Sequence, residues 1–419
     1  VGRGTVLSGI NWRCDVGLLG HRRRRWARTA AAGVLSAAAI VGGCAPVAPP
    51  DHEGGVDPDL VSGANDARYT ERGPYDVGVL TVEIQRGRKM EVWYPAVPQG
   101  ASAPKETYFI RDFLAPGFAA LLRPDVNPPF STDAIRGAAP AAAPGAGFPL
   151  VLFSHGAMSF RLQSTFLTTH LASWGFVVMS PDYFERGLQS LGGTPPALPR
   201  TASQVTDLAM TAMTDLSTTG SLADRVDLSR LFPIGHSAGG FQSTDLADRR
   251  VDVSSWIAMS AGAPLSPTLL NPFPQVPAAM TDPDAAAMWI TGRDDEVALL
   301  ATVRDAYRYT AGERKLVVVP RAGHNNAMTD ICEIGREDGG LIGIARSGGL
   351  PVPDAVAILA EDGCDSPPNF LGPEVWPVVR HFVTAELRYR AGLDAEPVGL
   401  GSGVVSAFGP AAPEYEHAE

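Results

Sequence analysis

Several features that mark particular classes of protein are scarce or absent in this sequence of 419 residues. Only 19% of the residues are charged and the net charge is −11, which argues against a nucleic-acid partner because such partners require a surplus of basic side chains. The body of the chain has no internal repeat and no apolar run of about eighteen residues, so we expect neither a solenoid nor a membrane-spanning helix there. Zinc-type spacing of His and Cys and a glycine-rich phosphate loop are also missing, so we expect no metal ion and no cofactor.

The N-terminal segment has the pattern that is typical of a targeting signal. An arginine-rich stretch, 21–28, precedes a short run of small apolar residues, 29–43, which is the order found in signal peptides. The run ends in Val-Gly-Gly-Cys44, which resembles a bacterial lipobox in which the cysteine is acylated and becomes the new N-terminus. The alternative is an ordinary signal peptide in which the cysteine occurs by chance. We therefore expect 1–44 to be a signal peptide with a lipobox, and the protein to be exported and either lipid-anchored at the outer face of the membrane or secreted.

The chain has only four cysteines. Cys14 falls in the leader and Cys44 would carry the lipid, which leaves Cys332 and Cys364. Because an exported protein folds in an oxidising compartment, we expect a disulfide bond between these two residues. Two separate buried thiols are the alternative.

The rest of the chain alternates between apolar runs and helix-like segments. After a linker at 45–70, rich in Pro, Gly and Asp, we expect a catalytic domain at 71–391 and a flexible tail at 392–419. Strands are expected at 77–84, 89–96, 149–155, 175–180, 230–235, 254–260, 286–291 and 315–320, and helices at 164–174, 202–216, 240–248, 296–311 and 373–391. Continuous apolar runs suit strands that are buried on both faces, so the fold class is α/β, with a mostly parallel central sheet and helices on both faces.

One strand ends in an unusual sequence, "LFPIGHSAGGF" (231–241). Ser237 lies between Gly235 and Gly239, the two positions where a Cβ would clash in a tight strand-to-helix turn. This is the G-x-S-x-G nucleophile elbow, which lifts a serine hydroxyl above the carboxyl edge of the sheet in the α/β-hydrolase fold. The alternative is a glycine-rich turn in which the serine only caps the following helix.

A serine needs a base, and in this architecture the order along the chain is serine, acid, histidine. His324 follows the last expected strand on a loop, whereas His381 falls within a helix and His417 within the tail, so His324 is our candidate base. The acid should follow the preceding strand, where two aspartates, Asp294 and Asp295, compete. Its role would be to orient the imidazole and to stabilise its protonated form.

The tetrahedral intermediate requires two backbone N–H donors. Ala238 follows the nucleophile and would supply the first, and Ala157, on the loop after strand 149–155, would supply the second. His155 and His236 flank these loops, and we interpret both as packing residues and not as metal ligands.

Six motifs in order resemble the plasma-type platelet-activating-factor acetylhydrolase family of α/β-hydrolases and its bacterial relatives. They are "GPYDVG" (73–78), "WYPA" (93–96), "LFSHGAMSFR" (152–161), "LASWGFVV" (171–178), "GHSAGG" (235–240) and "HNNAMTD" (324–330). The resemblance covers roughly 71–391. It implies hydrolysis of short or oxidised acyl esters of phospholipids and of small esters without a metal, and the roles given above to Ser237, His324, Ala157 and Ala238.

The chain departs from the mammalian members at the acid. Those members place it just after the strand that follows the elbow, where this chain has Ser260. The acid must then follow the next strand, as in dienelactone-hydrolase- and cutinase-like relatives. In such relatives the spacing Gly292-x-x-Asp295-x-Val297 is common, which favours Asp295 as the acid, with Val297 packed below it.

Together these features predict a serine carboxylic-ester hydrolase that acts through an acyl-enzyme on small-molecule or lipid esters of short-chain or phospholipid type. One alternative is a cutinase- or lipase-like enzyme for longer or polymeric esters, with apolar loops at 111–130 and 262–280 forming the acyl pocket. The other is a non-catalytic lipid-binding surface protein on a hydrolase scaffold. The intact elbow and base favour an enzyme, since a binding protein does not need them.

Overall fold

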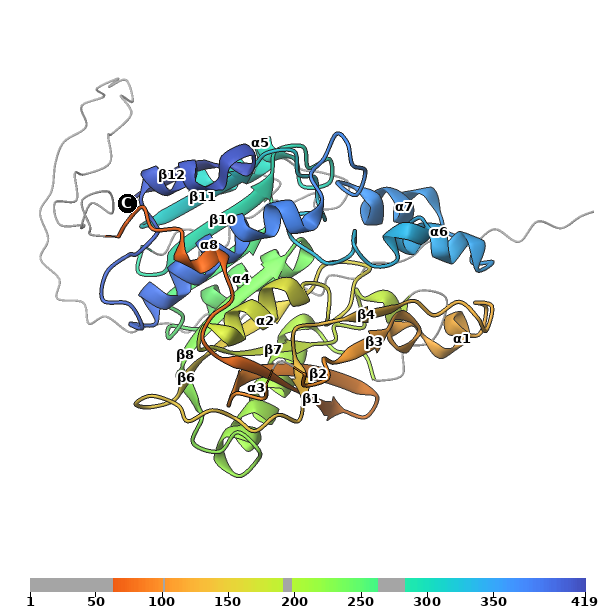
Figure 1. The fold of residues 1–419 in the computed structure, drawn as a ribbon, viewed down its shortest axis with the longest axis horizontal. Coiled ribbons are helices and arrows are strands. Elements are labelled where there is room, and N and C mark those ends of the chain that lie inside the picture. The colour runs from red at the N-terminus through yellow and green to blue at the C-terminus, as the bar shows by residue number, and fades with distance from the viewer. Residues whose placement is uncertain (1–62, 101, 191–197, 263–282) are drawn as a thin grey trace, which may run out of the picture. The chain divides into compact units, whose positions relative to one another are not determined.

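The computed structural model describes residues 63–100, 102–190, 198–262 and 283–419 (Figure 1). The expected signal peptide with Cys44, most of the linker and nearly all of loop 262–280 lie outside the described residues. None of the helices in the described ranges combines the length and the apolar character needed to span a bilayer.

A ten-stranded sheet forms the centre of the described part, in the order β12-β11-β10-β9-β8-β6-β7-β2-β1-β5. Its strands are β1 (Asp76–Gln85), β2 (Arg88–Ala96), β5 (Ile135–Arg136), β6 (Phe148–Ser154), β7 (Val177–Pro181), β8 (Val226–His236), β9 (Ser255–Met259), β10 (Ala286–Gly292), β11 (Arg314–Val319) and β12 (Glu414–Ala418). The block from β7 to β11 is parallel, whereas β2 pairs antiparallel with both β1 and β7, and β12 pairs antiparallel with β11. The expected α/β class and mostly parallel sheet are therefore confirmed.

Helices cover both faces because alternate residues of each strand point to opposite sides. On β6, Val151 and Phe153 pack in the same apolar cluster as the helices α2 (Thr165–Ser173) and α8 (Gly372–Arg390). Leu150 and Leu152 point the other way, into the cluster that includes α3 (Ala202–Thr218). The opposite face also carries α4 (Ala238–Arg249) and α5 (Leu300–Tyr309). These layers bury the strands on both sides, as their continuous apolar sequences predict.

The C-terminal segment is not a flexible tail, and this expectation is wrong. Strand β12 extends the sheet beside β11, and Tyr415 stacks on Phe382 of α8 with ring centroids 5.2 Å apart. Arg304 of α5 forms ion pairs with Glu414 and Glu416. The sequence Glu-Tyr-Glu-His of β12 contains no apolar run, and its glutamates pair with a charged side chain. The hydrophobic pattern of the sequence therefore gave no sign of a strand there.

The end of the expected linker is also folded. Residues 63–70 include a short 3-10 helix, Arg68–Thr70, in which Tyr69 is buried. The Tyr69 ring meets Trp174 edge-on at 4.9 Å and lies 5.8 Å from the ring of His381 on α8. Folded residues therefore occur several positions before 71, where the sequence analysis expects the domain to start.

Two further segments lie mostly outside the alternating core, although the first also contributes the edge strand β5. Residues 97–147 contain α1 (Pro116–Ala119) and a small sheet of β3 (Thr107–Phe109) and β4 (Pro129–Ser131). Between β11 and α8 the chain inserts α6 (Gly340–Ser347) and α7 (Asp354–Glu361), which lie together beyond the ends of the strands (Figure 1). We call residues 331–371 the insertion, and it contributes to the site described below.

Candidate active site

Ser237 stands at the turn between β8 and α4, in a backbone conformation of positive φ, with φ 55° and ψ −121°. Such a φ is strained for a residue with a side chain, and strain of this kind gathers at functional sites. A Cβ on Gly235 would lie 2.0 Å from the Gly239 carbonyl oxygen, and one on Gly239 would lie 1.8 Å from the Ser154 oxygen. Both glycines are therefore required by close backbone contacts, and they allow the turn to expose the serine at the edge of the sheet.

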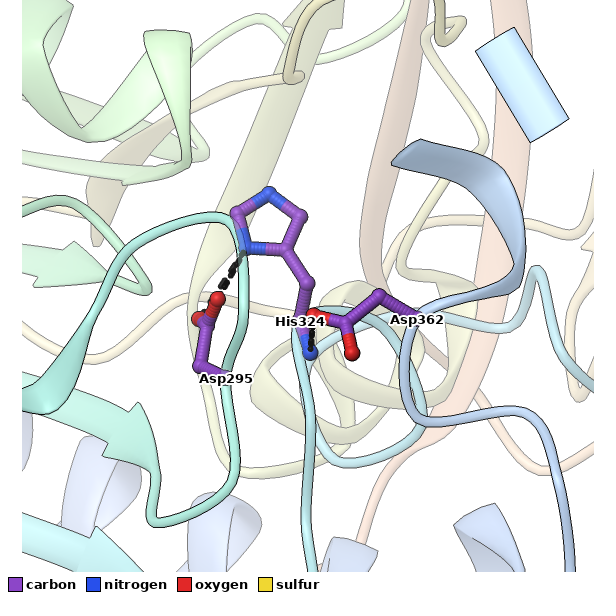
Figure 2. Close-up of side chains that lie close together, drawn as sticks. All are labelled: Asp295, His324 and Asp362. Atoms are coloured by element: carbon purple, nitrogen blue, oxygen red, sulfur yellow. Dashed lines mark hydrogen bonds and ion pairs between the residues drawn. The ribbon is translucent and has the colours of Figure 1, made fainter. Parts of the chain in front are cut away.

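His324 follows β11 and is almost completely buried. Its Nδ1 lies 3.0 Å from Oδ2 and 3.1 Å from Oδ1 of Asp295, which follows β10 (Figure 2). The other ring nitrogen, Nε2, is buried and has no hydrogen-bond partner among the described residues. Because the carboxylate accepts a hydrogen bond from Nδ1–H, it favours the neutral tautomer with the proton on Nδ1, in which Nε2 can act as a base.

The structure separates the two competing aspartates. Asp295 is buried, and its Oδ1 accepts the N–H groups of Val297 and Ala298 at 2.9 and 2.6 Å. Asp294 is exposed, and its backbone N–H donates to the Ala322 carbonyl. The expectation for Val297 is wrong, because its side chain is 39% exposed and it holds Asp295 through its N–H group and not by packing below it.

Ser237 and His324 line the same small pocket. Its walls come from the loop after β6, from the turn that carries Ser237, from the loop after β11 that carries His324 (the base loop) and from the insertion. The lining residues are Ala157, Met158, Ser159, Gln163, His236, Ser237, His324, Asn325, Ile331, Leu359 and Ala360. Of the described residues, none from the loop 111–130 contributes to this pocket. The insertion, to which the sequence analysis gives no role, supplies three of the apolar wall residues, Ile331, Leu359 and Ala360.

Of the two candidate N–H donors, Ala157 lines this pocket, and Ala238 directly follows Ser237, which also lines it. The N–H of Ala238 begins α4 and has no acceptor within the helix. The N–H of Met158 is bound to the Arg186 carbonyl at 2.6 Å, and that of Gly156 to the Gln163 side chain at 2.7 Å. Ala157 lies between them, and its N–H makes no hydrogen bond to any described residue. The loop is thus held by hydrogen bonds on both sides of the Ala157 N–H group.

Both flanking histidines bind backbone groups and not each other. Nε2 of His236 donates to the His324 carbonyl at 2.9 Å, and Nε2 of His155 accepts the Tyr183 N–H at 3.0 Å. Burial lowers the pKa of His236 well below its ordinary value and that of His155 to about 3, so both rings are neutral. His236 therefore has a role that the sequence did not reveal, since it holds the backbone of the candidate base.

A buried charge network anchors the loop that carries Ala157. Arg161 donates to Glu91 of β2 at 3.0 Å and to Asp182 at 2.8 Å, and the Arg161 and Glu91 side chains are almost fully buried. Burial raises the pKa of Asp182, whereas the adjacent Arg161 guanidinium opposes that rise. Removing one partner of such a network leaves an uncompensated buried charge. Each of these residues is therefore needed to hold the loop in place.

The disulfide expected between Cys332 and Cys364 is present. It joins the start of the insertion, which directly follows the loop of His324, to the segment just after α7. Arg336 donates to the Cys364 carbonyl at 3.2 Å, which binds the two segments further. The pocket wall formed by Leu359 and Ala360 is thereby tied covalently to the chain that carries His324.

These features define an α/β-hydrolase with an elbow serine, a buried histidine and a carboxylate at one edge of the sheet. Its residues 68–187 match the family described as platelet-activating factor acetylhydrolase, isoform II, so the chain is similar to that family. The match ends before Ser237 and therefore supports the fold and the Ala157 loop, not the serine, the acid or the base.

A solved structure gives the same fold over most of the chain. The ferulic acid esterase from Streptomyces cinnamoneus is 21% identical, with a TM-score of 0.51, and the alignment covers 83% of this chain and 97% of that one. At this identity the similarity shows the α/β-hydrolase fold alone. No curated protein matches the chain at a significant level. The family match supports an ester hydrolase.

Proposed function

We propose that the protein is a serine carboxylic-ester hydrolase that works through an acyl-enzyme. One observation carries the proposal: the hydrogen bond between Asp295 and Nδ1 of His324 leaves Nε2 free in the pocket that Ser237 lines. A lipid-binding protein would gain nothing from a buried carboxylate that orients an otherwise unpartnered imidazole.

The reaction follows from the roles of these groups. Nε2 of His324 accepts the Ser237 proton as Oγ attacks the ester carbonyl carbon, and the carboxylate of Asp295 stabilises the resulting imidazolium. The N–H groups of Ala157 and Ala238 stabilise the negative oxygen of the tetrahedral intermediate. His324 then protonates the leaving alcohol, and the acyl-enzyme forms. A water molecule, deprotonated by the same nitrogen, hydrolyses the acyl-enzyme and restores the serine hydroxyl.

The pocket favours esters with a short acyl group. Its walls beside Ser237 combine the apolar side chains of Met158, Ile331 and Leu359 with the buried amide of Asn325. The likeness to the acetylhydrolase family supports short-chain and phospholipid-type esters, although the acid follows β10 and not β9 as in the mammalian members. Export to an oxidising compartment, with anchoring through Cys44, agrees with the disulfide and belongs to the same proposal.

The test is a labelling and hydrolysis experiment on the exported protein. A fluorophosphonate probe should modify wild type at Ser237 and leave Ser237→Ala unlabelled, with peptide mass spectrometry to locate the adduct. A panel of p-nitrophenyl esters of increasing chain length, together with a short-chain phospholipid, should give the highest kcat/KM with the shortest acyl groups. Absence of both labelling and turnover would refute the proposed function, and a maximum at long chains would favour a lipase-like enzyme.

A further inference from the structure

A second carboxylate, which the sequence analysis did not single out, reaches the same site. Asp362 lies directly after α7 in the insertion and is partly buried. Its Oδ2 accepts the backbone N–H of His324 at 2.9 Å and that of Glu296 at 3.1 Å. Figure 2 shows that Asp362 approaches the main chain of His324 from the side opposite to the Asp295 contact.

These two N–H groups belong to different loops. Glu296 is the neighbour of Asp295 in the loop after β10, whereas His324 is in the loop after β11. A single oxygen therefore binds both the loop of the acid and the loop of the base. If either loop shifted relative to the other, one charge-assisted hydrogen bond would be lost, and such bonds are about twice as strong as neutral ones.

Other contacts fix Asp362 in this place. Its carbonyl oxygen accepts the Asn325 N–H at 3.1 Å, so the loop of His324 donates to the backbone of Asp362 as well as to its side chain. The disulfide of Cys364 with Cys332 closes the same unit two residues further on. On the opposite side, His236 binds the His324 carbonyl, so both backbone polar groups of the candidate base are held by side chains.

A metal site is the main alternative for this cluster. One ligand-type atom from each of Asp295, His324 and Asp362 lies within 4.8 Å of the others. The available contacts argue otherwise: Nδ1 of His324 is engaged with Asp295, and Oδ2 of Asp362 faces two N–H donors, whose positive ends would repel a cation. The contacts of Asp362 are therefore hydrogen bonds that link the loops after β10 and β11, and not those of a metal ligand.

We propose that Asp362 is a positioning residue for ester hydrolysis, which sets the Asp295–His324 hydrogen bond by binding the backbone of both loops through one carboxylate oxygen. The inference rests on the proposed function for its kinetic consequence. Displacements of about 1 Å at a catalytic group can cost about a hundredfold in rate, so a bond that fixes two loops affects kcat more than KM.

The test compares Asp362→Ala with Asp362→Asn, because asparagine keeps an oxygen that can accept both N–H groups. We expect the alanine variant to lose ten- to about a hundredfold in kcat with KM changed less than about threefold, and the asparagine variant to retain most of wild-type kcat. Asp365→Asn, an exposed neighbour without contact to either loop, is the matched control. If alanine prevents folding, Asp362→Ser replaces it, since a serine side chain is too short to reach both groups.

A second readout does not depend on turnover. The Nδ1 proton of His324 should give a low-field proton resonance in the resting protein, which Asp362→Ala shifts or broadens and Asp362→Asn preserves. An alanine variant with unchanged kcat and an unchanged resonance would overturn the inference, as would an effect confined to KM or an asparagine variant as impaired as alanine. If wild type showed no Ser237-dependent turnover while the resonance still responded to the Asp362 substitutions, the esterase function would be refuted. The positioning role of Asp362 would then still stand.

Discussion

Oδ2 of Asp295 and Nδ1 of His324 lie 3.0 Å apart, although 29 positions of the chain separate the two residues. Each follows a strand of the parallel sheet, and β10 and β11 are neighbours, so the sheet brings their loops together. The neighbouring Asp294 has no such contact and points to solvent.

The first prediction separates these aspartates. Asp295→Asn should lower kcat by about 10⁴-fold, because an amide stabilises the wrong imidazole tautomer and cannot compensate the imidazolium charge. Asp294→Asn should remain within a fewfold of wild type. Both are measured with a short-chain p-nitrophenyl ester at neutral pH, with circular dichroism as the control for folding. A dead Asp294→Asn together with an active Asp295→Asn would reverse the assignment.

The second prediction concerns the nucleophile. Ser237→Ala should lower turnover by about 10⁴-fold or more, while the melting temperature stays close to that of wild type, since the hydroxyl makes no hydrogen bond to a described residue that folding would lose. Steady-state kinetics and thermal denaturation on the same preparation provide the check. A variant that keeps a tenth of wild-type activity would disprove the role of Ser237.

The third prediction concerns the disulfide, whose cysteines are 32 positions apart. Closing a loop of this size contributes about 3–4 kcal/mol to the free energy of unfolding in the chain-entropy model. Cys332→Ser/Cys364→Ser should therefore unfold at a lower temperature and should lose kcat, because the insertion carries Asp362. Reduced wild type should behave like the double variant, and equal stability of oxidised and reduced protein would contradict the prediction.

The fourth prediction concerns acid sensitivity. Burial lowers the pKa of His155 and His170 to about 3 and that of His381 to about 4, and it lowers the pKa of His236 well below 6.5. The unfolded chain binds protons at these residues near pH 6.5 and the folded chain does not, so stability is complete above that pH and is lost as pH falls. Each group contributes a slope of up to about 1.4 kcal/mol per pH unit. Burial raises the pKa of Asp330 to about 7, which gives a slope of opposite sign and offsets one histidine.

This dependence is measured by urea unfolding between pH 7.5 and 5. His170→Gln should reduce the slope by the share of one group, and comparison with wild type isolates it from the carboxyl groups. If the free energy of unfolding of both proteins changes equally with pH, His170 is not the neutral, buried residue described above.

The fifth prediction concerns the leader. A labelled fatty acid should be incorporated into wild type and not into Cys44→Ala, because only a lipobox cysteine is acylated. Membrane fractionation of both proteins provides the second readout. Wild type that appears only as unlipidated protein in the medium would show that the segment is an ordinary signal peptide.

The sequence by itself determined the core of the fold and the candidate nucleophile and base. Uninterrupted apolar runs predict strands buried on both faces, and Gly235 and Gly239 indicate a turn that only glycine can form. These signals are local, so they can be read from a few consecutive residues.

The spacing around Gly292 favoured Asp295, but only the tertiary structure shows its carboxylate facing the imidazole, whereas the chemically identical Asp294 is exposed. The tertiary structure also placed Asp362 at the backbone of His324 and gave His236 its carbonyl partner, contacts between segments that are distant along the chain. The same holds for β12, where charged residues form a strand because Arg304 and the edge of β11 complete it. A charge or a hydrogen bond is satisfied by whatever the fold brings near, and a local pattern carries no record of that partner.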